Sequence, residues 1–189
     1  MEAWLANRAT TEPHAAVLLV VLYTGLRRGE VLGLRWSDIG AGWVRTEQQV
    51  IRVDGQVVIR GLKTDASYRT ISVDPTVTAL LGALRKAQRV TRLDGLVFTR
   101  DGGPIHPELL THSARGHAFP GAAVPAVGVH GLRHTAASMP ISDGRLASEV
   151  AAQLGHADAI VTQRVYAHLE PQRAAATGRR LGELLRGAE

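Results

Sequence analysis

The chain contains no cysteine among its 189 residues, which excludes disulfide bonds and metal sites built on thiolates. It also lacks a long hydrophobic run. The apolar segment at residues 15–23 is much shorter than the roughly 20 residues that a membrane-spanning helix needs. No basic segment precedes it, as a secretory signal would require. We therefore expect a cytoplasmic protein with no membrane partner.

Lysine is scarce as well. It occurs only at Lys63 and Lys86, so nearly all of the 22 basic residues are arginine, and the net charge is +5. A basic chain favours a polyanionic partner, most simply nucleic acid. Arginine can also bind a phosphate through two parallel hydrogen bonds, which lysine cannot do. A GC-rich genome would enrich arginine and alanine too, and this origin does not exclude DNA binding.

The pattern of residues predicts an α+β fold that is mainly α, with a small three-stranded antiparallel sheet. The apolar content of 45% is enough for one packed domain over residues 1–189. β-Forming residues lie between positions 43 and 73, and Asp54-Gly55 interrupts them as in a hairpin. Strands are expected at about 43–53, 56–62 and 68–73. Helices are expected at about 11–24, 28–34, 74–89, 107–117, 131–139, 145–154, 158–168 and 171–187.

Local signals set the ends of several of these helices. Thr11 is the expected N-cap of the first, and Gly25 its terminator. Asp74-Pro75 is expected to begin the helix at 74–89. Proline inside a helix costs about 3 kcal/mol. The helix that carries Arg133 is therefore expected to end or kink at Met139-Pro140.

Two imidazoles, a guanidinium and a phenol between His130 and Tyr166 suit chemistry on a phosphodiester. Five motifs contain this chemistry, in this order: Thr24-Gly25-Leu26-Arg27-Arg28-Gly29-Glu30; Gly61-Leu62-Lys63-Thr64 with Tyr68-Arg69-Thr70-Ile71-Ser72-Val73; His130-Gly131-Leu132-Arg133-His134; Leu154-Gly155-His156; and Tyr166. Over about residues 12–170 they resemble the boxes of the tyrosine recombinases, the phage integrase family. The resemblance implies the catalytic-domain fold of that family.

The resemblance to this family also implies an enzyme that cuts and rejoins duplex DNA through a 3′-phosphotyrosine, without metal, cofactor or ATP. Cleavage of a phosphodiester gathers negative charge on the non-bridging oxygens, which Arg27 and Arg133 would stabilise. His156 would donate a hydrogen bond to one of these oxygens. Tyr166 is the expected nucleophile. Its phenol, with an ordinary pKa of about 10, needs a proton acceptor or a positive field in order to attack.

The remaining site residues have supporting roles. Lys63 would protonate the departing 5′-oxygen from a mobile turn, and His130 would act as general base or bind the phosphate. His134 is expected to pack near the site. Glu30 either orients Arg27 or is an ordinary solvated residue, and Arg28 is expected to be solvated.

Two other functions compete with this one. His130 and His134 share a helix face, so with His156 or Glu149 they could bind a metal ion. Gly131 occupies the position where a zinc hydrolase of that motif has its general base. A DNA-binding relic without catalysis would keep the basic surface. However, all six catalytic positions are filled, which favours an active enzyme.

The resemblance also sets expectations for domains and partners. Family members place core-binding and arm-binding domains before the catalytic one, and we expect both to be absent here. The expected partner is double-stranded DNA, bound as a tetramer by a chain that is a monomer in isolation. Accessory DNA-bending proteins are a further possible partner. The helix within residues 171–189 would pack on its own core or exchange between protomers.

Overall fold

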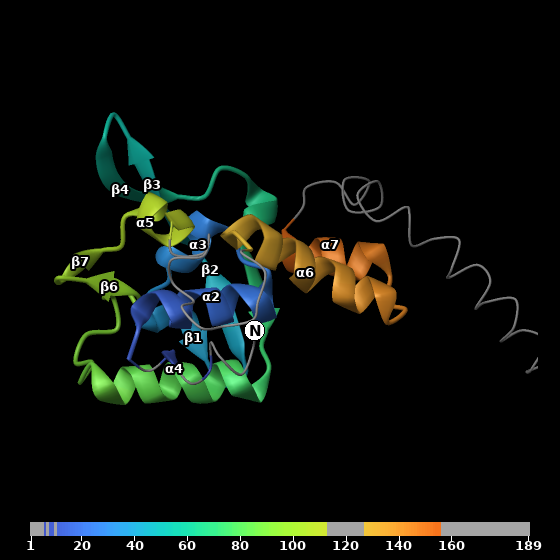
Figure 1. The fold of residues 1–189 in the computed structure, drawn as a ribbon, viewed down its shortest axis with the longest axis horizontal. Helices are drawn as coiled ribbons and strands as arrows, with labels where there is room; N and C mark the ends of the chain where they lie inside the picture. The colour runs from blue at the N-terminus through green and yellow to red at the C-terminus, as the bar shows by residue number, and fades with distance from the viewer. Residues whose placement is uncertain (1–5, 7, 10, 113–126, 156–189) are drawn as a thin grey trace, which may run out of the picture.

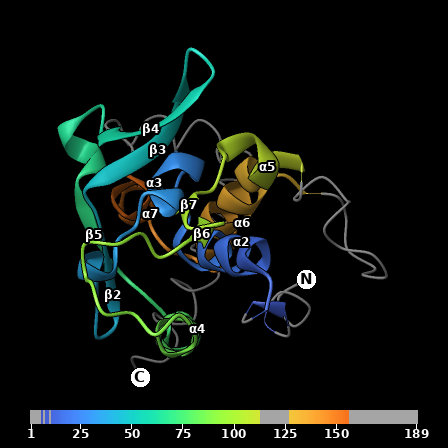
Figure 2. The ribbon, with the colours of Figure 1, turned by 90° about the vertical axis from the view of Figure 1, so that its left-hand side faces the viewer.

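The structure, a computed structural model, describes residues 6, 8–9, 11–112 and 127–155 (Figure 1). Its centre is helix α2, Pro13–Thr24, whose residues from Ala15 to Val21 are all buried. A helix that is apolar all round has to be enclosed by other elements. Here α2 packs against α3, α4 and α6. Figure 2 shows α2 and α6 side by side, with β2 and β5 along one flank of the molecule.

The ends of α2 agree with one expectation and contradict another. Gly25 ends the helix in the left-handed region at φ 66°, and its N–H donates to the carbonyl of Val21, as expected. The predicted N-cap was wrong. Glu12 occupies that position, Pro13 begins the helix, and the hydroxyl of Thr11 donates instead to the carbonyl of Arg8.

The other helices lie close to their predicted positions. At the start of α4 the Asp74 carboxylate accepts the N–H of Thr76 at 2.8 Å, which confirms the predicted cap. The helices predicted at 158–168 and 171–187, and the end of the one predicted at 107–117, lie outside the described residues. The helices are α3 Arg28–Leu32, the short 3-10 helices η1 Trp36–Asp38 and η2 Asp65–Ser67, α4 Pro75–Ala87, α5 Pro107–His112, α6 Val129–Ser142 and α7 Ala147–Leu154.

The α+β class is confirmed, but the strands predicted between residues 43 and 73 form two separate sheets and not one. The three-stranded sheet consists of β1 (Ile39–Gly40), β2 (Trp43–Thr46) and β5 (Arg69–Ser72), in the order β1-β2-β5. A separate hairpin pairs β3 (Gln48–Val53) with β4 (Gln56–Gly61). A third pair joins β6 (Thr99–Arg100) and β7 (Gly103–Pro104).

The predicted first strand therefore divides at Glu47. Its second half leaves the sheet because it packs against α3, where the side-chain amide of Gln48 donates to the carbonyl of Gly33 at 2.9 Å. The β3-β4 hairpin that results projects from one end of the molecule in Figure 1. Its turn is Asp54-Gly55, with both φ angles positive, as the sequence predicted.

Helix α6 does not end at Met139 as expected. It continues through Pro140 to Ser142. Proline removes one backbone donor, but Ile141 is buried against α7 in a small apolar cluster with Ala137, Val150 and Leu154. This packing holds the last turn of α6. Among the described residues, no helix is long and apolar enough to cross a membrane.

We expect Gly33→Ala to destabilise the domain by about 1–3 kcal/mol, a typical cost of overpacking. Gly33 has φ −86°, which alanine adopts freely, but a Cβ there would lie 2.7 Å from the carbonyl oxygen of Gln48. Urea unfolding measures the change. Gly82→Ala is the control, because a Cβ at Gly82 meets open space and alanine favours a helix by about 1 kcal/mol. Equal stability of the two variants would contradict the predicted close packing.

Candidate active site

Arg27 lies at the start of α3, where its backbone and its side chain both bind Glu30. The Arg27 N–H donates to Glu30 Oε2 at 2.9 Å, and Arg27 Nη1 donates to Glu30 Oε1 at 2.7 Å. Its guanidinium side chain remains 42% exposed. Arg27 is therefore fixed in direction while part of it still faces the solvent.

Glu30 is buried, so it is not the solvated residue of one sequence interpretation. Its side chain is 2% exposed, and it receives Arg69 Nη2 at 2.9 Å from an arginine that is itself only 8% exposed. Burial alone would raise the pKa of Glu30. The hydrogen bonds and charge of Arg69, together with the bonds from Arg27, outweigh that effect and lower the pKa. Glu30 is therefore the carboxylate that joins two arginines.

Arg133 enters the same region from α6. It is buried, and its guanidinium donates to the carbonyls of Gly25 and of Leu154, the latter at 2.8 Å. It thus ties the end of α2 to the end of α7. These contacts hold Arg133 beside the first turn of α3, where Arg27 lies.

Three arginines converge on three successive backbone carbonyls at the end of α7. Arg69 Nε donates to Gln153, Arg133 Nη2 to Leu154 and Arg27 Nη2 to Gly155, at 2.8, 2.8 and 2.9 Å. The last carbonyls of a helix have no partner within it and carry partial negative charge. We call the side chains of Arg27, Arg69 and Arg133 with these carbonyls the arginine clasp.

Gly155 lets the clasp close. It caps α7 in the left-handed region at φ 65°, and a Cβ there would lie 2.7 Å from Arg69 Nη1. A side chain at this position would therefore displace Arg69 and strain the backbone. The clasp fixes the path of the chain immediately before His156.

His130 and His134 form a pair on the exposed side of α6. Their Nε2 atoms lie 2.9 Å apart, and the rings meet edge to face. One ring must therefore donate and the other accept while both are neutral. Partial burial lowers the pKa of His134, and the charges of His130 and Arg133 lower it further. His134 thus contacts His130 directly, which agrees with the expectation that it lies near the site.

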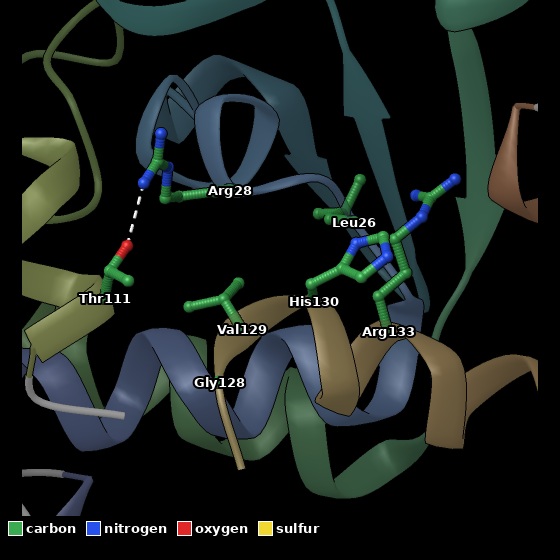
Figure 3. A pocket seen from close by; sticks show the side chains of 7 residues that line it. All are labelled: Leu26, Arg28, Thr111, Gly128, Val129, His130 and Arg133. Atoms are coloured by element: carbon green, nitrogen blue, oxygen red, sulfur yellow. Dashed lines mark hydrogen bonds between the residues drawn. The ribbon is translucent and has the colours of Figure 1, made fainter. Parts of the chain in front are cut away.

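A cavity of about 310 Å³ opens between α3, α5 and the start of α6 (Figure 3). Arg28 lies on one wall, where its Nη1 donates to Thr111 Oγ1 at 2.7 Å. His130 and Arg133 lie across the opening from it in Figure 3. The lining residues are Leu26, Arg28, Thr111, Gly128, Val129, His130 and Arg133.

Three predicted site residues are not part of these contacts. Lys63 is exposed in the loop between β4 and η2, in a turn as predicted, and it has no hydrogen bond to another described residue. His156 and Tyr166 lie outside the described residues. Within the described part of the chain no three His, Asp or Glu side chains could hold a metal ion, so the alternative with Glu149 as third ligand has no support there.

The sequence matches the phage integrase family over residues 2–173. The chain belongs to the phage integrase family. It is 30% identical over 182 residues to a XerC-like tyrosine recombinase of Caldanaerobacter subterraneus, which covers 83% of this chain and 46% of that protein. It is 31% identical over 159 residues to a prophage phiRv2 integrase of Mycobacterium tuberculosis, which covers 81% of this chain and 42% of that one. This phage integrase family chain thus spans less than half the length of these two relatives.

Solved structures agree on the fold of this family member. The Tn1549 transposon integrase, in complex with transposon right end DNA, superposes with a TM-score of 0.75 at 21% identity, over 96% of this chain and 64% of that one. The XerA recombinase superposes with a TM-score of 0.69 at 23% identity, over 95% and 62%. The catalytic-domain fold expected from the sequence motifs is therefore confirmed.

Sequence reasoning missed Arg69 and Arg28 as site residues of this integrase family chain. Arg69 lies inside the motif that contains Lys63, but nothing in its local sequence shows that it is buried against Glu30. Arg28 is exposed, as the sequence predicted. The contact to Thr111, which lies 83 positions later, exists only in the folded chain.

We expect Glu30→Gln to destabilise the domain by about 3 kcal/mol or more, because it leaves the buried guanidinium of Arg69 without its carboxylate. Arg69→Met should cost a similar amount, and the double variant less than the sum of the two. Urea unfolding at neutral pH measures all three. Arg92→Ala, which breaks an exposed pair with Asp94, is the control and should change stability by less than about 0.5 kcal/mol.

The pH dependence should have a definite sign. Because the pKa of Glu30 is lowered by folding, its contribution to stability is complete above the ordinary value of 4.5 and is lost as the pH falls through the lowered value. The stability gap between wild type and Glu30→Gln should therefore narrow in acid. A gap that stays constant or widens in acid would contradict this account of Glu30.

Proposed function

We propose that this chain is the catalytic part of a site-specific DNA recombinase that cuts and rejoins duplex DNA through Tyr166. The observation that carries the proposal is the arginine clasp. Arg27 and Arg133 come from different helices and donate to the adjacent carbonyls of Gly155 and Leu154. Two guanidiniums held side by side are suited to the negative charge that gathers on a phosphodiester as it is cleaved.

The contacts of Arg27 leave it able to bind phosphate. A guanidinium has five N–H donors, and Arg27 uses three of them on Glu30, Ser67 and Gly155. Because Glu30 also receives Arg69, one carboxylate serves two cations and the site keeps an excess of positive charge. In this proposal Glu30 is the residue that positions Arg27, and Tyr166 attacks in the positive field of the arginines.

Proton transfer falls to His130 and Lys63. His134 engages Nε2 of His130, which leaves Nδ1 as the ring nitrogen that His130 offers to the phosphate or to the attacking hydroxyl. Lys63 is exposed in its loop and would reach the departing 5′-oxygen. His156, which follows the clasped carbonyls directly, would donate to a non-bridging oxygen.

The reaction needs no metal ion and no ATP in this proposal. Attack by the Tyr166 hydroxyl forms a phosphotyrosine bond as the bond to the 5′-oxygen breaks, so the energy of the phosphodiester is kept for rejoining. The proposed partner is duplex DNA, and the solved structure of the Tn1549 integrase is a complex with transposon right end DNA. Assembly as a tetramer on DNA, exchange of residues 171–189 between protomers and accessory DNA-bending proteins belong to the same proposal.

We expect the chain to form a covalent adduct with a nicked duplex that carries its recombination site. The nick lets the short fragment that carries the freed 5′-hydroxyl diffuse away. The phosphotyrosine therefore accumulates, and the attached DNA retards the protein on a denaturing gel. The site is first selected as the sequence that the chain binds in a random duplex library. The reaction is run in EDTA, since a metal-dependent hydrolase would be inactive there.

Tyr166→Phe should abolish this adduct, and Tyr23→Phe should leave it intact, since Tyr23 packs in α2 against the core. An adduct that survives Tyr166→Phe would disprove the nucleophile. DNA binding by a wild type that forms no adduct would favour the non-catalytic alternative.

We expect Lys63→Ala to slow cleavage of an ordinary 5′-oxygen by about 10²–10⁴-fold, the usual contribution of a general acid. A 5′-thiol leaving group needs no proton, so the same variant should cleave the thiol substrate at nearly the wild-type rate. The comparison uses single-turnover rates on the two substrates. Lys86→Ala, which removes the other lysine from α4, is the control. Equal slowing on both substrates would mean that Lys63 does not donate the proton.

A further inference from the structure

The cavity in Figure 3 lies beside the clasp and is not used by the chemistry proposed above. One wall includes His130 and Arg133, which belong to the proposed site. The opposite wall ends at Arg28. Its volume of about 310 Å³ is roughly ten times the share of one water molecule in the liquid. It therefore has room for a chemical group the size of a sugar with its phosphate.

Arg28 is held at the edge of this cavity by a contact from a distant part of the chain. Its Nη1 donates to Thr111 Oγ1 at 2.7 Å, and Thr111 in turn donates to the carbonyl of Pro107 inside α5. No carboxylate lies among the lining residues. The hydrogen bond that directs the guanidinium therefore comes from a neutral partner. Glu108 lies outside the cavity lining, although the charge of Arg28 helps to lower its pKa.

The rest of the lining is apolar. Leu26 and Val129 contribute aliphatic side chains between the two cationic walls, and Gly128 contributes none. Such a surface suits the carbon atoms of a deoxyribose, and the walls suit its phosphates. A small inorganic anion would contact the cationic walls but would leave the aliphatic side chains without an apolar partner.

We propose that this cavity binds the sugar–phosphate unit next to the scissile phosphate on the cleaved strand, with Arg28 contacting the neighbouring phosphate. The inference rests on the proposed function, because Arg133 of the clasp marks the end of the cavity where the scissile phosphate lies. From there the strand continues toward Arg28. Thr111 positions the guanidinium of Arg28, and Gly128 keeps the cavity open.

The first test measures how salt weakens binding of a fluorescein-labelled duplex that carries the selected site. Each lost phosphate contact reduces the slope of log K against log[salt] by about 0.9. Arg28→Ala should show this reduction between about 50 and 200 mM salt, with a roughly 5- to 10-fold weaker affinity at 0.1 M. Arg85→Ala removes the same charge from α4, on the far side of the molecule in Figure 1, and should keep the wild-type slope.

The second test finds the phosphate. Single phosphates of the nicked duplex are replaced in turn by neutral methylphosphonates, and the rate of adduct formation is measured. In wild type, neutralising the phosphate adjacent to the scissile one should slow the reaction several-fold. In Arg28→Ala, neutralising that same phosphate should not slow adduct formation any further. Neutralising other phosphates should slow the variant as much as it slows wild type. Thr111→Val should give an intermediate loss at the same position.

Gly128→Val tests whether the cavity is occupied. A Cβ at Gly128 meets no atom within 4 Å, and its φ of −68° suits any residue, so the added methyl groups take up space at the lining of the cavity without a clash. Because Gly128 is the N-cap of α6 and valine is a poor cap, urea unfolding first shows that the variant is folded under the binding conditions. Binding should weaken, whereas Gly82→Ala, also in open space, should not change it.

The inference is overturned if Arg28→Ala shows the same salt slope and affinity as Arg85→Ala while wild type still forms the adduct. Absence of adduct from wild type would instead defeat the proposed function, and the salt slope would still report on Arg28.

Discussion

The domain depends on the hydrogen bonds that three buried or half-buried guanidiniums donate to the end of α7. Arg27, Arg69 and Arg133 come from α3, β5 and α6, so the clasp fastens three elements to a fourth. Each bond satisfies a carbonyl that the helix leaves unpaired, and each places a cation at the negative end of the helix dipole. The same bonds orient the side chains and close the fold.

The use of backbone carbonyls has an electrostatic consequence. A carboxylate partner for each arginine would cancel its charge, whereas a carbonyl directs the guanidinium and leaves the charge in place. In the described part of the chain, Glu30 alone forms ion pairs with Arg27 and Arg69. Its negative charge between the two guanidiniums offsets part of their mutual repulsion. The result is a preorganised positive site that does not have to rearrange when an anion arrives.

Signals that act over a few residues could be predicted from the sequence. Gly25 ends α2, Asp54-Gly55 makes the hairpin turn and Asp74 caps α4, because each depends on the conformation or side chain of one or two neighbours. The six candidate site residues were found by motif order, and the structure places two of them, Arg27 and Arg133, at one helix end.

What depends on distant packing could not be read in the same way. The β-forming residues from 43 to 53 are compatible with one strand or two, and the division follows from packing of β3 against α3, including the contact of Gln48 with Gly33. Pro140 predicted that the helix ends or kinks there, and burial of Ile141 against α7 lets the helix continue through it. Arg69 showed no local sign of its burial.

The span of the clasp along the chain affects the order in which the site is made. Arg27 closes on a carbonyl 128 positions later, and Arg133 on one that lies 108 positions before it. Contacts of such separation close long loops of chain, which makes them slow to form. During synthesis, Arg27 emerges early and stays without its partner until residue 155 has left the ribosome. A nascent or prematurely ended chain therefore contains Arg27 and Arg69 without the carbonyls that orient them.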